Sequence, residues 1–347
     1  MFKKFKYLFA LIVPALTYYS LQQTGWRAYS VLLFSFFIVP MADFIFPASE
    51  ENMNAVEEEM AKRDIFYDGL LYAIVPIHLF LLWTFLTGLS AQESSADRIG
   101  HVIAMGLACG VFGINVAHEL GHRNSAFEQF LSKLLLLTTL YMHFFIEHNR
   151  GHHKNVSTEE DAASAVKGEM VYVFWMKSMI GAWKHAWGIE WARLSKLSFI
   201  GRIWKNEMMW YQIIQILFLI SIAYFFSIEV LYNYLPAAFI GILLLETVNY
   251  IEHYGLRRKK SESGIYEKVQ VMHSWNSNHP IGRILLFELT RHSDHHYIAN
   301  RPFQLLRHFD QSPQMPAGYP AMLILSLCPP LWFKVMDKRV EELSNAA

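Results

Sequence analysis

The chain has 347 residues, of which 53% are hydrophobic and only 17% are charged. Soluble domains contain about 25% charged residues, so this composition excludes an ordinary soluble protein and predicts a membrane protein. Lysine plus arginine and aspartate plus glutamate balance at 30 each, which leaves no basic field for nucleic acid. The two cysteines, Cys109 and Cys328, belong to no CxxC pair, so neither a disulfide framework nor a thiolate metal site is expected.

Six stretches are apolar enough, or nearly so, to cross a bilayer, which takes about 20 mostly apolar residues in a helix. They are residues 7–20, 28–46, 70–89, 100–117, 210–227 and 231–250. The first stretch follows three lysines as a signal peptide would, but a second apolar run comes directly after it without a clear cleavage site. We therefore expect a retained anchor and an all-α membrane protein with six transmembrane helices.

The distribution of lysine and arginine predicts the orientation, because cytoplasmic loops carry the excess of these residues. With the N-terminus inside, the three outer loops are 21–27, 90–99 and 228–230, and they contain only Arg27 and Arg98. This predicts cytoplasmic N- and C-termini. The apolar stretch 127–146 is expected to form a hairpin or an interfacial helix pair, because a crossing there would separate histidine clusters that need to meet.

The segments outside these stretches show no internal repeat and no low-complexity linker. Residues 50–59 are acidic and predict a solvated helix. Residues 321–335 are apolar but interrupted by Pro329 and Pro330, so we expect a docked or half-inserted segment. One domain, residues 1–347, is the simplest interpretation.

Nine of the sixteen histidines lie in four clusters. Imidazole suits iron, zinc and copper, and spacings of three or four residues put two rings on one face of a helix. The predicted orientation places all four clusters on the cytoplasmic side, in or next to inner segments. The sequence therefore predicts a polyhistidine metal site, with its ligands drawn from His118, His122, His148, His152, His153, His253, His292, His295 and His296.

The number of histidines favours two metal ions over one. The HExxH pattern of His118 and His122, with Glu119 as a general base, is also that of zinc metalloproteases. A protease zinc needs only three protein ligands, which would leave the later clusters unexplained. A metal transporter or haem carrier would place its sites along a pathway through the spans. The adjacent pairs His152–His153 and His295–His296 can each turn their rings toward different metals.

Acidic and polar residues beside the clusters are expected to hold the ligands in place. Metal-bound imidazoles usually donate their second N–H to a carboxylate or carbonyl. Direct metal ligation by a carboxylate is the alternative. The residues assigned to this outer layer are Glu119, Glu147, Asp161, Glu252, His273 and Asp294.

These motifs resemble those of the bacterial membrane alkane monooxygenases, within the wider group of membrane fatty-acid desaturases and hydroxylases. The resemblance rests on His118–His122, Glu147–His153, Asn249–Gly255 and Arg291–His296, and it continues through Met272–His279 and Ala317–Pro320. It implies a multi-pass protein of the bacterial inner membrane that inserts one oxygen atom of O2 into the terminal C–H bond of an alkane. The nine histidines would then bind two non-haem irons.

The resemblance also implies the partners. Electrons would come from rubredoxin, which rubredoxin reductase reduces with NAD(P)H, and without a CxxC pair in this chain that rubredoxin must be a separate protein. The alkane would arrive from the bilayer, and basic residues such as Arg257 and Arg258 would steer an acidic carrier or bind anionic lipid. A fatty-acyl desaturase or hydroxylase is the alternative function.

One residue departs from the resemblance. Ser35 stands in the run Leu33–Phe37, where members of the family often present a bulky side chain to the substrate tunnel. If Ser35 lines the tunnel, a deeper tunnel would admit longer chains. The other interpretation is that its hydroxyl bonds the backbone of its own helix.

Overall fold

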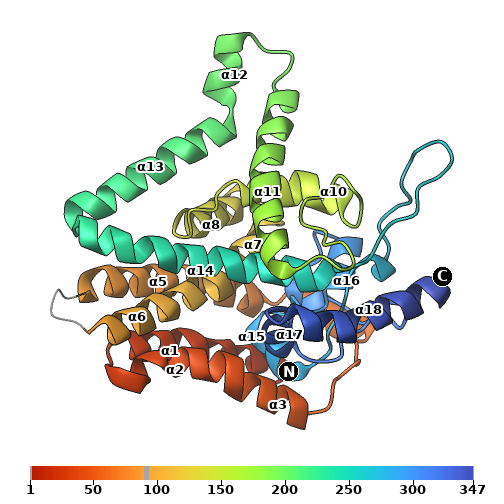
Figure 1. The fold of residues 1–347 in the computed structure, drawn as a ribbon, viewed down its shortest axis with the longest axis horizontal. Coiled ribbons are helices and arrows are strands. Elements are labelled where there is room, and N and C mark those ends of the chain that lie inside the picture. Colours follow the sequence, from red (N-terminus) through yellow and green to blue (C-terminus); the bar gives the residue numbers. More distant parts are fainter. Residues whose placement is uncertain (1, 90–93, 347) are drawn as a thin grey trace.

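The computed structural model describes residues 2–89 and 94–346, and within these ranges it contains helices and loops but no β-strand (Figure 1). Among the described residues, five helices are long and apolar enough to cross a membrane. They are Gly25–Ile45 (η2 to α3), Ile65–Gly88 (α5), Ser95–Gly121 (α6 to α7), Glu207–Phe225 (α13) and Ile228–His253 (α14). The prediction of an all-helical membrane protein is confirmed.

The predicted first span, residues 7–20, is helical as η1 (Phe2–Leu11) and α1 (Ile12–Leu21) but is not among these five. Its crossing of the membrane stays a prediction. Other helices begin earlier than the apolar pattern indicated, because polar side chains cap them. Asp64 accepts a hydrogen bond from the backbone N–H of Phe66 at the start of α5, and Ser94 does so from Asp97 at the start of α6.

Glycines let the two central helices approach each other closely. A Cβ atom on Gly110 would lie 2.6 Å from the Leu244 side chain, and one on Gly241 would lie 2.6 Å from the Cβ of Cys109. Gly110 belongs to the π-helical turn η4 (Cys109–Ile114), between α6 (Ser95–Ala108) and α7 (Asn115–Gly121). Small residues at such crossings are typical of membrane helix pairs. The close packing brings the C-terminal ends of α7 and α14 together.

The apolar stretch 127–146 turns back on itself, as expected. Helix α8 (Ala126–Leu137) ends in a turn where Leu140 has a φ of 57°, and α9 (Phe144–Glu147) returns. The ring centroids of His118 and His148 are therefore only 4.5 Å apart, although this apolar stretch separates them in sequence.

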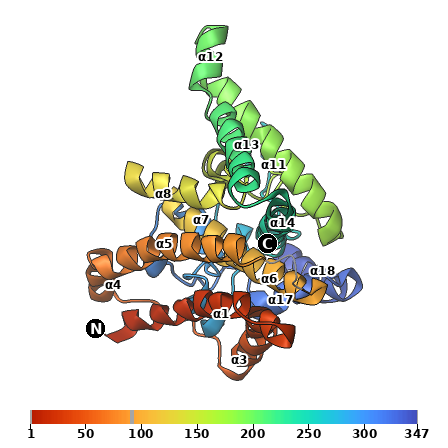
Figure 2. The ribbon, with the colours of Figure 1, turned by 90° about the vertical axis from the view of Figure 1, so that its left-hand side faces the viewer.

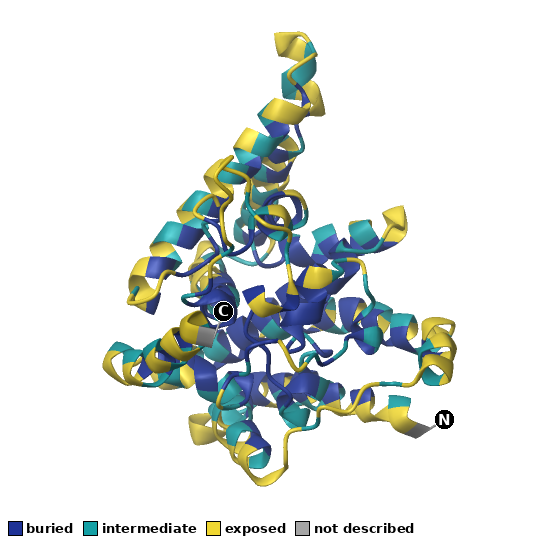
Figure 3. Ribbon diagram, turned by 90° about the vertical axis from the view of Figure 1, so that its right-hand side faces the viewer, coloured by how far each residue is buried: buried dark blue, intermediate teal, exposed yellow. Residues whose placement is uncertain are grey.

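An arm built from α11 (Val171–Arg193), α12 (Phe199–Lys205) and α13 extends from the bundle (Figure 2). The bundle interior is buried, whereas the tip of the arm is exposed (Figure 3). The predicted solvated helix is α4 (Ala55–Lys62), and residues 321–335 are divided between α17 (Tyr319–Ser326) and α18 (Pro329–Ala346). The remaining short helices are α2 (Ser30–Leu33), η3 (Phe34–Ile38), α3 (Val39–Ile45), η5 (His148–His152), α10 (His153–Asn155), η6 (Val271–His273), α15 (Pro280–Leu285), α16 (His292–Tyr297) and η7 (Phe303–Leu305).

Candidate metal centre

Four short stretches of helix present the nine clustered histidines to one another. Two of these stretches end predicted spans: α7 carries His118, with His122 at its C-cap, and α14 ends at His253. The other two are the η5–α10 turn with three histidines and α16 with three more. Most of these side chains are buried, so the clusters face inward and not toward solvent.

The first group consists of His118, His122, His148, His153 and His295, and their candidate ligand nitrogens all lie within 4.8 Å of one another. Nε2 of His118 is 2.9 Å from Nε2 of His295. Nε2 of His148 is 3.1 Å from Nε2 of His122 and also 3.1 Å from Nε2 of His153. All five rings thus turn the same nitrogen toward one point.

The second group consists of His152, His253, His292 and His296, with ligand nitrogens again within 4.8 Å of one another. Nε2 of His292 lies 3.2 Å from Nε2 of His253. The adjacent residues His152 and His153 belong to different groups, as do His295 and His296. The structure therefore brings together all nine predicted ligands and divides them five and four.

The π-helical turn η5 explains how one segment serves both groups. Residues five apart follow each other along the wider π turn, and His148 and His153 accordingly face the same point. His152 turns its ring toward the second group. A regular α-helix would place residues four apart on one face, and would have aligned His148 with His152.

The hydrogen-bond pattern of these rings fits bound cations. Two nitrogens that face each other at about 3 Å share at most one proton, so several lone pairs converge without a donor. Buried nitrogens without a hydrogen-bond partner in the described chain include Nε2 of His152 and both ring nitrogens of His296. Burial beside other imidazoles holds the pKa well below its usual range and keeps the ring neutral, the form that binds metal, for His148, His153, His292, His295 and His296.

Two buried glutamates of α14 lie near the histidine groups. Glu252 accepts a hydrogen bond from the Tyr319 hydroxyl (2.8 Å) and lies 3.1 Å from Nε2 of His292. Glu246, two turns earlier on α14, accepts from the Tyr141 hydroxyl (2.6 Å). Neither carboxylate pairs with a lysine or arginine of the described residues, and an unpaired buried charge is costly. Metal cations in the two histidine groups would supply the missing charge.

Asp161 is the predicted outer residue with the most direct contact to a histidine. Its Oδ2 atom lies 2.9 Å from Nδ1 of His152 and also accepts from the Ser164 hydroxyl. Burial opposes the charged form, but His152 and the hydrogen bonds outweigh it and lower the pKa of Asp161 to about 2. Because the carboxylate holds Nδ1 of His152, the Nε2 atom of the same ring is free to face the other three histidines of the second group.

The other predicted outer residues have different partners. The His273 backbone and the Ser274 hydroxyl lie beside His253, and Glu147 lies 3.2 Å from Nδ1 of His185. Two of them bind arginines: Glu119 accepts from Arg123 and from the backbone of Phe303, and Asp294 accepts from Arg301 and from the backbone of Arg307. These carboxylates hold the segments that carry the histidines.

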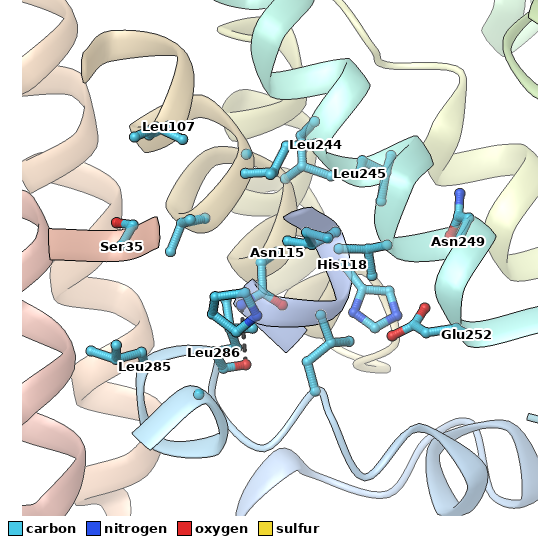
Figure 4. A pocket seen from close by; sticks show the side chains of 18 of the residues that line it. Ser35, Leu107, Asn115, His118, Leu244, Leu245, Asn249, Glu252, Leu285 and Leu286 are labelled. Atoms are coloured by element: carbon cyan, nitrogen blue, oxygen red, sulfur yellow. Dashed lines mark hydrogen bonds between the residues drawn. The ribbon is translucent and has the colours of Figure 1, made fainter. Parts of the chain in front are cut away.

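An apolar cavity reaches the histidine groups from inside the bundle. It encloses about 910 Å³, part of it open to the outside, and both π-helical turns η3 and η4 contribute to its wall. His118, His148 and His292 line it together with Glu252, and Ser35 lines it as well. In Figure 4, Ser35 lies to the left and His118 and Glu252 to the right.

Sequence reasoning missed some residues of the site. Asn115 lines the cavity, and Glu246 pairs with Tyr141 behind it. Glu190 of α11 accepts a hydrogen bond from Arg150, which lies between the histidines of η5. A polar residue one turn before a ligand, or a carboxylate within an apolar span, would have been the signal for the first two.

Nine histidines gathered at the ends of membrane helices, beside an apolar cavity, define a helical membrane protein with a polyhistidine metal centre. The sequence profile of the fatty acid desaturase family matches residues 99–325. Alkane 1-monooxygenase 1 of Pseudomonas aeruginosa is 40% identical over 97% of this chain and 91% of its own length. The chain belongs to the alkane 1-monooxygenase family.

Two further relatives also match over most of this chain. Alkane 1-monooxygenase of Acinetobacter baylyi is 39% identical over 88% of this chain and 75% of its own length. Alkane 1-monooxygenase 1 of Alcanivorax borkumensis is 37% identical over 96% of this chain and 83% of its own length. The matches cover most of this chain.

Proposed function

We propose that the protein is a di-iron monooxygenase that hydroxylates the terminal methyl group of alkanes to 1-alkanols. The observation that carries the proposal is the apolar cavity that ends on His118, His148 and His292, in a chain of the alkane 1-monooxygenase family. The reaction consumes O2, two electrons and two protons and yields the alcohol and water. Two iron ions held by the nine histidines would supply O2 activation and C–H cleavage.

The residues of the chain perform the rest of the task. Apolar side chains bind the alkane, orient its end toward the histidines and exclude water, since an aliphatic chain offers no polar handle. Asp161 fixes the ring of His152. Ser35 lines the cavity away from the histidines in Figure 4, and its small side chain would suit long alkanes.

We also propose the partners and location that this reaction needs. A separate rubredoxin, reduced by rubredoxin reductase with NAD(P)H, delivers the electrons, and the alkane enters from the lipid. The excess of lysine and arginine in the predicted inner segments supports a bacterial inner membrane with the histidine groups on the cytoplasmic side.

A fatty-acyl desaturase or hydroxylase is the second candidate, because the desaturase profile covers residues 99–325. An intramembrane zinc protease would need three protein ligands, His118 and His122 among them, and would leave at least six gathered histidines without a role. The desaturase alternative shares the metal centre and differs in product.

The test is metal analysis of the detergent-purified protein, followed by turnover with a reduced rubredoxin system, labelled O2 and an alkane of medium length. The proposal expects about two irons per chain and labelled 1-alkanol. Two irons without alcohol, but with oxidation of acyl chains, would support the desaturase alternative. A single zinc and no dependence on O2 would overturn the proposal.

A further inference from the structure

The wall of the cavity next to the histidines contains a turn with an uncommon backbone. Leu285, Leu286 and Leu289 line the cavity. Between them, Phe287 and Glu288 both adopt left-handed angles, with φ of 52° and 56°. L-residues with side chains rarely occupy this region, so contacts outside the turn must hold its shape.

Two sets of contacts hold the turn, one on each side. On the side away from the cavity, the buried carboxylate of Glu288 accepts from the Tyr7 hydroxyl (2.7 Å) and from Nε of Arg283 (2.7 Å), and Lys6 lies 3.2 Å away. On the cavity side, Nδ2 of Asn115 donates to the carbonyl oxygen of Leu286 at 3.1 Å. Asn115 itself lines the cavity and is 9% exposed.

The turn is connected to both histidine groups, to the first through the Asn115 side chain on α7 and to the second through the chain that continues into α16. Asn115 stands one helical turn before His118, so the two side chains share a face of α7. The turn continues through Arg291 into α16, which carries His292, His295 and His296. Figure 4 shows the bond between Asn115 and Leu286 beside His118. On the cavity side, the Asn115 side chain thus links the leucine wall to the helix that carries His118.

The leucine wall matters because the terminal carbon of an alkane is not the carbon that is oxidised most easily. A terminal methyl C–H bond is stronger than the C–H bond of the neighbouring methylene group, so geometry alone can direct oxidation to the terminal carbon. We propose that Asn115 is a positioning residue that, by holding Leu286, keeps the methylene group away from the metal ions. This inference rests on the proposed function and adds the device that selects the reacting carbon.

The test compares products of the wild-type protein and of the Asn115→Leu variant, which keeps the side-chain size but cannot donate. With octane as the probe, the ratio of 2-octanol to 1-octanol should rise about fivefold, the shift in partition expected from the loss of one hydrogen bond. Both alcohols come from the same iron-loaded protein. A variant that is merely less stable therefore makes less total alcohol but keeps the same ratio of 2-octanol to 1-octanol.

Two further variants make the result specific. Asn115→Gln keeps a donor and should give a ratio between those of the wild type and the leucine variant. Asn233→Leu removes a similar amide-to-carbonyl bond, to Glu229 at 2.8 Å on α14 outside the cavity, and should leave the ratio unchanged. If Asn115→Leu does not fold, Asn115→Val, which also lacks a donor, takes its place.

The outcomes separate the two proposals. A wild-type protein that makes 1-octanol and an Asn115→Leu variant with the same isomer ratio would overturn this inference and leave the proposed function intact. A wild-type protein that makes no alcohol would overturn the proposed function itself.

Discussion

At the scale of single residues, the contact between Asp161 and His152 assigns one carboxylate to one of the two histidine groups. His152 belongs to the second group, whereas none of the five histidines of the first group has a hydrogen bond to Asp161 within the described ranges. Loss of an outer carboxylate typically weakens metal affinity about 10- to 100-fold. The consequences should therefore fall on the second group.

We predict that Asp161→Asn lowers the metal content from about two ions toward one, because only the second group loses its support. The measurement is metal analysis after titration with a chelator. Glu159→Gln, an exposed change two residues away, is the matched control and should retain both ions. Equal loss from both groups in Asp161→Asn would contradict the assignment.

Ser35 gives a second prediction at this scale. Because Ser35 lines the cavity, Ser35→Trp should shorten it and shift the preferred alkane to shorter chains, with little change in turnover of the shortest ones. The measurement is the product yield across a series of chain lengths. Ser221→Trp on α13, where the serine bonds its own helix backbone and does not line the cavity, is the control. An unchanged chain-length profile for Ser35→Trp would place the substrate elsewhere.

At the scale of elements, α11 braces the histidine-bearing turn η5. Glu190, fully buried on α11, accepts from Nη1 of Arg150 (3.0 Å), from Arg193 and from the backbone N–H of Glu207 (2.9 Å). One carboxylate thus connects η5, α11 and the start of α13. The arm is therefore part of the support of the metal centre.

We predict that Glu190→Gln destabilises the protein by about 1–3 kcal/mol, because a buried acceptor of several donors is replaced by a neutral amide. The midpoint of thermal unfolding in detergent measures the effect, and the rate of metal release should rise with it. The control is Glu229→Gln, which removes an exposed ion pair with Arg98 and should cost no more than about 0.5 kcal/mol. Similar losses for both would refute the bracing role.

The elements also mark where sequence reasoning reaches its limit. Apolar length located the helices, and histidine spacing on helices identified the ligand candidates that the structure gathers. The π-helical turns had no signature in the residue pattern, because a single widened turn depends on packing and not on local preference. The sequence therefore predicted that His152 and His153 could diverge, but not that His148 would join His153.

At the scale of the whole molecule, both histidine groups lie at the end of the bundle where α7 and α14 finish. The predicted orientation places that end on the cytoplasmic side. The contacts of polar partners such as Glu190 and Asn115 could not be predicted, because they join segments that are distant in sequence. The helical fold was predictable because a segment that crosses lipid must pair all its backbone hydrogen-bonding groups, which an α-helix does within itself.

Cysteine labelling tests the orientation. In a Cys328→Ser background, where the remaining Cys109 is buried, Thr24→Cys and Glu262→Cys place single thiols at exposed positions near opposite ends of the bundle. A membrane-impermeant maleimide should label position 24 in intact cells and position 262 only after permeabilisation. The reverse pattern would invert the topology.

The division of the histidines between two groups has a consequence for the life of the protein in the cell. Each group ties together segments from distant parts of the chain, from His118 to His296, so bound metal acts as a cross-link that closes long loops. A newly made chain in a metal-starved cell would lack both cross-links and expose the segments between the histidines to proteases. The amount of folded protein in the cell should then depend on the supply of metal as strongly as it depends on the rate at which the chain is synthesised.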